Sequence, residues 1–236
     1  MSLLTIAQQV ADEIGVGRPS ALFGSNEPTA RRLLAAANGA GQDLYRAHKW
    51  SILEREYEFS TSADVDNYAV PDDWGRPLSD TAWDRSTFWK MKGAVTPQRW
   101  QELRSGLGVN PALRRHFRLV VGPLAGSILI DPVPTATGDD LVIEYISRNW
   151  CESSGGVGQA AFLADTDECR IDHELFRLGL LWRMKRALEL AYAADQFDYE
   201  QAFYRAKVAD IALPKTCLAH PRDLPVARYP EGSWNA

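Results

Sequence analysis

The chain has 236 residues, of which 45% are hydrophobic and 24% are charged. A chain of this length can bury a core without disulfide bonds, and the composition argues against wholesale disorder. The formal net charge is −5, from 31 acidic and 26 basic residues. This charge argues against a protein whose main task is to grip nucleic acid phosphates, although a channel wall that DNA slides past remains compatible with it.

The three cysteines, Cys151, Cys169 and Cys217, are far apart in the sequence and form no CxxC pair. Their spacing favours reduced thiols over a zinc or redox site. No apolar stretch approaches the roughly 18 residues of a membrane span. The first residues turn acidic where a signal peptide would stay apolar. We therefore expect a protein that has no membrane contact and is soluble in the cytoplasm when it is made.

Two helices are expected near the N-terminus. The first is predicted by apolar residues at helical spacing followed by a glycine: Ile6, Val10, Ile14 and Gly15. The second has Pro28 in its first turn and runs toward Trp50. Its centre holds Gly39 and Gly41, which a helix tolerates best where another backbone packs closely against it.

The pattern then changes to a period of two. The segments REYEF and NYAV flank a polar turn and predict a β-hairpin that ends at Pro71. TPQRWQEL, from Thr96, predicts a short helix, and HFRLVV, SILI and LVIEYIS predict three further strands. We expect an antiparallel β region between helical segments.

A strongly helical run extends from Ile171 to about Ile211, as one long helix or as two with a bend. Asp172 suits its N-terminus, and Pro214 marks its end. Residues 213–236 contain several prolines and no periodic pattern, so we expect an extended tail.

The features that could form a chemical site each have a simpler structural interpretation. Glycines in SSGGVGQAAF resemble a phosphate-binding loop, but no GK[ST] follows and a flexible loop is favoured. Acidic pairs could bind a divalent cation, but they lie in turn-like sequence where Asp bonds to the backbone. These residues are Gly155, Gly156, Gly158, Asp72, Asp73, Asp139, Asp140, Asp165 and Asp167.

Cys169 and His173 invite a thiol–imidazole reading, but an orienting group and an oxyanion donor are missing from the pattern. The basic cluster Arg183, Lys185 and Arg186 is better explained as a solvated helix face than as a nucleic acid contact. We predict no catalytic residue, no metal site and no cofactor.

Tryptophans gather in the β region at Trp74, Trp83, Trp89 and Trp100. They could stack on nucleic acid bases, since arginines and lysines lie close in the sequence. Core packing and subunit contact are favoured, because the surrounding charge is not basic and Trp is enriched at interfaces.

Several segments, taken in their order along the chain, resemble those of a known protein family. They are TIAQQVADEIGV, PTARRLLAAANGAGQDLYRAHKW, EREYEFST with YAVPDDWGRPLSDTAWD, LVIEYISRNWC, FLADTDECRIDHELFRLGLLWRMKRALEL and DYEQAFYRAKV. Together they span most of residues 1–210, and in this order the chain resembles the head-to-tail adaptor proteins of short-tailed bacteriophages.

The resemblance implies an α+β fold in which a bundle of N- and C-terminal helices carries a β-rich insertion. It divides the chain into residues 1–50, 51–150, 151–212 and the tail 213–236. It also implies a structural virion protein, not an enzyme, whose copies form a twelve-fold ring between the portal protein and a tail or nozzle protein. DNA would pass through the ring without specific binding.

By the same resemblance, Trp74, Trp83 and Trp89 face tail components. The tail residues Leu224, Tyr229 and Trp234 are expected to contact the portal or a neighbouring subunit, by laying an extended backbone in a groove. A strap folded over the chain's own core is the alternative for this tail. The alternative function is a phage-encoded nucleic acid-binding accessory protein or enzyme that uses the Trp and Arg segment 74–104.

Overall fold

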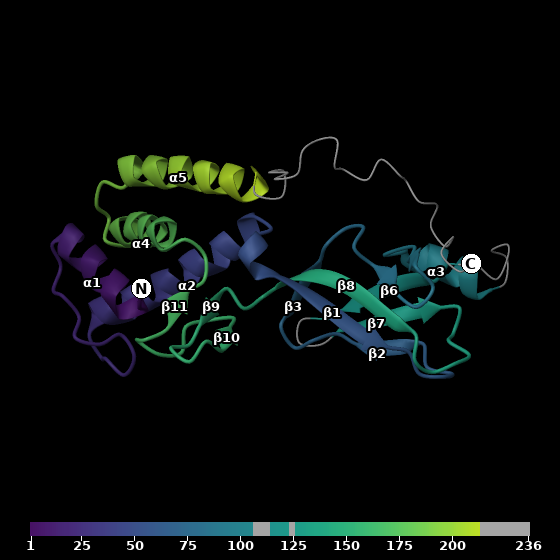
Figure 1. Ribbon diagram of the computed structural model, residues 1–236. Helices are drawn as coiled ribbons and strands as arrows, with labels where there is room; N and C mark the ends of the chain where they lie inside the picture. Colours follow the sequence, from purple (N-terminus) through teal and green to yellow (C-terminus); the bar gives the residue numbers. More distant parts are fainter. Residues whose placement is uncertain (106–113, 123–125, 213–236) are drawn as a thin grey trace, which may run out of the picture. The chain divides into compact units, whose positions relative to one another are not determined.

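The computed structural model describes residues 1–105, 114–122 and 126–212, so the predicted extended tail lies outside the described residues. The described chain divides into two compact units (Figure 1). Residues 1–54 and 147–212 form a helical unit, and described residues between 55 and 146 form a β unit. The α+β class predicted from the sequence is confirmed.

Helix α1 (Leu3–Ile14) forms and ends before Gly15, as the sequence predicts. The side chain of Ser2 accepts a hydrogen bond from the backbone N–H of Thr5, and this caps the first turn. Gly15 ends the helix with a φ of 79°, in the left-handed region that glycine enters without strain. One face of α1 is buried, through Leu3, Ile6, Ala7, Val10 and Ala11.

Helix α2 (Pro28–Ala47) starts with its proline in the first turn, as predicted. The close approach expected at its glycines occurs at Gly41 alone, and the neighbour is the indole ring of Trp150 instead of a backbone. A Cβ at Gly41 would lie 2.0 Å from that ring, whereas a Cβ at Gly39 would meet nothing within 4 Å. The small centre of α2 therefore makes room for one large side chain.

The C-terminal helical run is two helices, α4 (His173–Ala187) and α5 (Ala193–Ala212). Asp172 caps α4 by accepting a hydrogen bond from the N–H of Leu175 at 2.7 Å. The chain leaves α4 through Glu189, whose φ of 57° is incompatible with a continuing right-handed helix. Within the helical unit, α4 contacts α1, α2 and α5 (Figure 1).

A short 3-10 turn, η1 (Ser51–Leu53), follows α2, and a small antiparallel sheet completes the helical unit. Its strands are β9 (Cys151–Glu152), β10 (Gly158–Gln159) and β11 (Glu168–Cys169), in the order β10-β9-β11. The register places Cys151 directly opposite Cys169.

The β unit contains two sheets and one short helix. In the first, β1 (Glu54–Ser60), β8 (Asp140–Ser147), β4 (Trp83–Asp84) and β5 (Trp89–Lys90) follow one another, and β3 (Trp74–Pro77) also pairs with β8. The second has the order β2 (Asn67–Ala69), β7 (Gly126–Asp131), β6 (His116–Val121). Helix α3 (Pro97–Arg104) is capped by Thr96, as its sequence predicts.

The hairpin predicted before Pro71 is wrong. Both strands form, but β1 pairs with β8 and β2 pairs with β7, so they belong to different sheets. They meet through side chains: the rings of Phe59 and Tyr68 lie 5.0 Å apart, and the hydroxyl of Tyr57 donates to the carbonyl of Ala69. The alternating pattern fixed which residues face inward, while pairing was decided by strands distant in the sequence.

Buried aliphatic and aromatic side chains from both sheets form the core of the β unit: Trp74, Ala82, Met91, Phe117, Ile128, Ile130, Leu141, Ile143 and Tyr145. In the part of the chain that the structure describes, no helix has the length and apolar character needed to cross a membrane.

Candidate interaction surfaces

Helix α5 packs against the rest of the helical unit through an aromatic inner face. Tyr199 lies 6.1 Å from Trp182 of α4, and Phe203 lies 6.0 Å from Trp50, both measured between ring centroids. Lys185 of α4 donates to Asp195 at 2.6 Å. Aromatic contacts and one ion pair therefore decide which face of α5 is turned inward.

Asp210 holds the far end of α5. Its carboxylate accepts a 2.6 Å hydrogen bond from the Ser51 hydroxyl, accepts the Ser51 backbone N–H at 3.2 Å and lies 2.9 Å from Nε2 of His48. The side chains of His48 and Asp210 are largely buried. A shielded carboxylate with several polar partners fixes a helix more firmly than an exposed one.

The opposite face of α5 carries an apolar stripe. Phe197, Tyr204, Val208 and Ile211 recur at intervals of seven, four and three residues, and their side chains are 59%, 66%, 48% and 44% exposed. This spacing places them on one side of the helix. We call these four residues the outer stripe of α5. Apolar side chains gathered in this way on a folded surface are characteristic of sites of protein–protein contact.

A groove lies between α2 and α4 in the same unit. It has a volume of about 580 Å³, and its lining combines three arginines, one aspartate, one indole and small side chains: Arg32, Arg183, Arg186, Asp43, Trp182, Ala35, Ala36 and Ala187. Arg183 pairs with Asp43 and lies 4.5 Å from the centre of the Trp182 ring. Arg32 and Arg186 are exposed. We call this feature the arginine groove.

The three tryptophans predicted to face tail components have different environments. Trp74 is buried and stacks on Tyr145 at 4.6 Å, so its side chain supports the core of the β unit. Trp83 is 38% exposed, and Trp89, which is half-buried, lies 4.5 Å under the guanidinium of Arg114. Phe88, half exposed between β4 and β5, adds an aromatic side chain that the sequence pattern did not single out.

A buried carboxylate organises this region. Asp84 is 2% exposed, accepts hydrogen bonds from the backbone N–H groups of Ser86 and Thr87, and receives the Nε–H of Arg115 at 2.8 Å. Arg115 also pairs with Asp139. Neither Asp84 nor Arg115 was identified from the sequence, because the two residues are 31 positions apart and no motif joins them.

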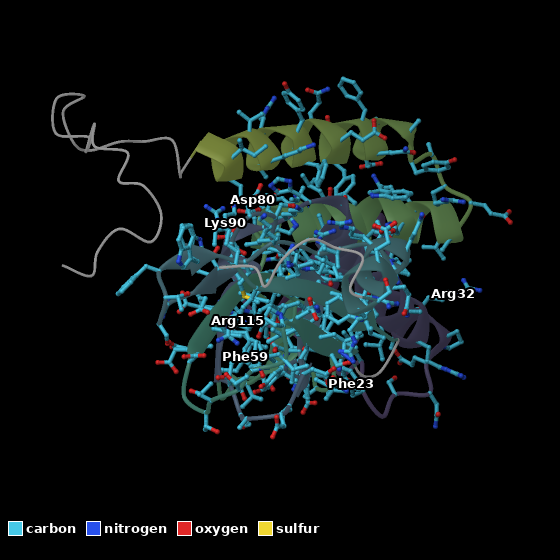
Figure 2. The ribbon with its side chains drawn as sticks, turned by 90° about the vertical axis from the view of Figure 1, so that its right-hand side faces the viewer. Phe23, Arg32, Phe59, Asp80, Lys90 and Arg115 are labelled. Atoms are coloured by element: carbon cyan, nitrogen blue, oxygen red, sulfur yellow. The ribbon has the colours of Figure 1, made fainter. Side chains whose placement is uncertain are left out.

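At least four of the six basic side chains of the segment 74–104 are engaged by carboxylates. Arg85 contacts Glu56 and Glu58. Lys90 donates to Asp80 at 2.8 Å, and Figure 2 shows these two labelled residues close together. Two further pairs join Arg99 to Glu102 and Arg104 to Asp66. The positive charge of this segment is therefore largely balanced within the β unit.

Acidic residues considered as cation ligands serve the fold. Asp165 accepts the backbone N–H groups of Leu22 and Phe23. Asp167 does the same for Leu163 and Ala164. Asp73 accepts the Tyr145 hydroxyl and Asp140 accepts that of Ser60. Within the described ranges, no group of three His, Cys, Asp or Glu side chains is arranged to hold a metal ion.

Cys169 and His173 have separate surroundings. The thiol of Cys169 is directed at the carbonyl of Trp150, 4.0 Å away, and burial raises its pKa to about 12. Nε2 of His173 lies 3.4 Å from the N-terminal amine, which also pairs with Glu168. A buried neutral thiol is a poor nucleophile. The glycines considered as a phosphate loop lie in and beside the turn between β9 and β10, where Gly156 has a φ of 79°.

Comparison with known proteins places these surfaces in context. The family model described as SU10 adaptor protein matches residues 1–223. The chain belongs to the SU10 adaptor protein family. No curated protein matches it. The resemblance to phage head-to-tail adaptors is thereby confirmed at the level of the family.

Membership of the SU10 adaptor family identifies a structural protein of a bacteriophage, since an adaptor family is not an enzyme family. It implies a component of the virion that contacts other phage structural components. For an SU10 adaptor, the relevant sites are therefore surfaces. The tail residues Leu224, Tyr229 and Trp234 lie outside the described residues.

Proposed function

We propose that this chain forms a homo-oligomeric ring, twelve-fold as the adaptor resemblance implies, that joins the portal vertex to the tail and extends the DNA channel. The outer stripe of α5 carries the proposal. It exposes two aromatic and two aliphatic side chains on a helix whose opposite face contacts Trp182 and Trp50. A monomeric protein has no need for such a surface, whereas a ring subunit buries it.

The helical and β-rich parts of the chain have different roles in this assembly. The helical residues 1–50 and 151–212 build the ring, and the β-rich insertion 51–150 contacts the tail or nozzle protein. Trp83, Phe88 and Trp89 offer aromatic surface for that contact, whereas Trp74 is buried against Tyr145 in the core of the β unit. Exposed aromatic side chains are the usual anchors of protein interfaces.

The tail residues Leu224, Tyr229 and Trp234 are proposed to contact the portal or a neighbouring subunit. The aromatic residues supply large apolar area, and the prolines around them disfavour helix. Deletion of residues 213–236 is expected to prevent capture by portal rings in a pull-down and to leave the melting temperature of the isolated chain nearly unchanged. Retained capture would contradict the proposed contact of the tail with the portal, and a large drop in melting temperature would support a strap over the core.

The alternative, a nucleic acid-binding accessory protein or enzyme that uses residues 74–104, has less support. Arg85, Lys90, Arg99 and Arg104 are all paired with carboxylates, which leaves little charge for phosphates. Salt-dependent binding of a short DNA duplex by the isolated chain would favour this alternative.

The test is mass photometry of the chain mixed with rings of its portal protein. We expect a complex whose added mass equals a complete ring of adaptor copies, with Tyr204→Glu reducing the occupancy and Glu27→Lys, an exposed control at the start of α2, leaving it unchanged. Portal rings that gain no mass, or only one or two copies, would contradict the ring.

A further inference from the structure

The helical unit carries a ridge and a groove on different surfaces. The ridge is the outer stripe of α5, and the groove is the arginine groove between α2 and α4. One copy cannot fill its own groove with its own stripe, because α5 holds α4 through its opposite face, where Tyr199 meets Trp182 and Asp195 meets Lys185. Any match between the two features must therefore join different copies.

The groove is electropositive and has a small-residue lining. Arg183 is neutralised by Asp43, but Arg32 and Arg186 have no carboxylate partner among the described residues. Figure 2 labels Arg32 on the helical unit, where its side chain is exposed. The alanines of the lining leave room for larger side chains from a partner. A partner that fits would bring apolar bulk together with negative charge.

One end of the ridge, the outer stripe of α5, combines apolar bulk with negative charge. Asp198 and Glu200 are exposed and follow Phe197 by one and three residues, so at 100° per residue they flank the stripe on both sides. Asp198 has no cationic partner in the described chain, and Glu200 accepts only from Gln196. Among the described residues, Asp198 and Glu200 thus have no cationic partner, and Arg32 and Arg186 have no carboxylate partner.

The first part of the outer stripe fits the groove in length. The whole stripe, from Phe197 to Ile211, spans about 21 Å of helix and exceeds the groove, which follows about 16 Å of α2 from Arg32 to Asp43, whereas the part from Phe197 to Tyr204 spans about 10 Å, at 1.5 Å per residue. Two turns of α5 therefore fit along the groove.

We propose that the first part of the outer stripe of α5, from Phe197 to Tyr204, docks in the arginine groove of the next copy, with Asp198 and Glu200 facing Arg32 and Arg186. This deepens and rests on the proposed ring function, for which it names the subunit contact. Ridge and groove are different surfaces, so the contact is head-to-tail, the type that closes into a ring when the rotation between copies allows it.

The test uses two charge-reversed variants. The groove variant carries Arg32→Glu and Arg186→Glu, and the ridge variant carries Asp198→Lys and Glu200→Lys. Each alone sets like charges against each other, and we expect self-association, measured by sedimentation velocity and by copies per portal ring, to weaken by more than about tenfold. An equimolar mixture of the two should associate again, because alternating copies restore every contact. Arg31→Glu, an exposed change on the same helix outside the groove lining, is the control and should have no effect.

The outcomes separate this contact from the ring itself. If wild-type rings form on the portal and both variants still form them, or the mixture fails to recover, the contact is overturned and the ring proposal stands. If the variants and their mixture behave as expected in solution but no ring forms on the portal, the contact stands and the ring proposal fails. A photo-cross-linking residue at position 204 should label the α2 or α4 peptides of a second copy. Labelling of the portal protein alone would overturn the contact.

Discussion

The indole ring of Trp150 occupies the space where a side chain at Gly41 would begin, with a distance of 2.0 Å from its nearest atom to an ideal Cβ. Trp150 is fully buried and meets Phe162 edge to face at 4.9 Å. The ring is therefore held on both sides. The helix α2 and the segment after β8 depend on a residue without a side chain at position 41.

Gly41→Ala is expected to destabilise the chain by about 2 kcal/mol, because overpacking outweighs the gain in helix propensity. Gly39→Ala is the matched control: it lies two residues away on the same helix, where a Cβ meets nothing, and it should stabilise by about 0.5 kcal/mol. Urea unfolding followed by circular dichroism measures both. Equal effects of the two substitutions would contradict the close packing.

Removal of Arg115 should destabilise the β unit strongly. Asp84 is almost fully buried, and Arg115→Ala would leave its carboxylate without a cation, at a cost of about 3 kcal/mol. Arg85→Ala breaks only exposed pairs with Glu56 and Glu58 and should cost less than about 1 kcal/mol. Thermal or urea unfolding of both variants gives the comparison, and an Arg115→Ala chain as stable as Arg85→Ala would show that the buried pair contributes little.

Asp210 is expected to control how tightly α5 is held. Asp210→Ala removes the acceptor of the Ser51 hydroxyl and N–H and the partner of His48, which should cost about 1–3 kcal/mol and raise amide hydrogen exchange in the second half of α5. In the monomeric chain, Asp198→Ala, on the exposed side of the same helix, should leave the exchange unchanged. Unaltered exchange in Asp210→Ala would mean that the aromatic face alone holds α5.

Cys151 and Cys169, which lie opposite each other in strands β9 and β11, should not react with thiol reagents in the folded chain. Burial raises the pKa of both Cys151 and Cys169 to about 12, so at pH 8 the reactive thiolate is far scarcer than in an unfolded chain, where a free thiol has a pKa of about 8.5. In a Cys217→Ser background, Ellman's reagent should react with neither thiol until guanidinium unfolds the chain, and then with both. Rapid reaction under native conditions would contradict their burial.

Local chemistry made much of the fold predictable. Helix α1 was marked by its spacing and Gly15, and α3 by Thr96 and Pro97, because caps act within a few residues. The strands β6, β7 and β8 followed from their alternating or apolar runs. Pairing was not predictable in the same way: β1 and β2 join partners more than fifty residues further along the chain, so the adjacent segments only looked like a hairpin.

The candidate surfaces were harder to find from the sequence. The break at Glu189 has no glycine or proline to mark it, and so the two faces of α5 could not be assigned. The arginine groove joins α2 to α4 across about 140 residues, and only Arg183, Lys185 and Arg186 stood out as a basic cluster. In the structure Lys185 is turned to Asp195 of α5, while Arg183 and Arg186 line the groove.

Cryo-electron microscopy of the portal vertex, in particles of the phage that encodes this chain, tests the central claim most directly. We expect a closed ring of copies of this chain between the portal and the tail, with α5 of each copy against α2 and α4 of the next. A vertex in which the portal meets the tail without this chain, or in which the chain is present as isolated copies, would contradict it.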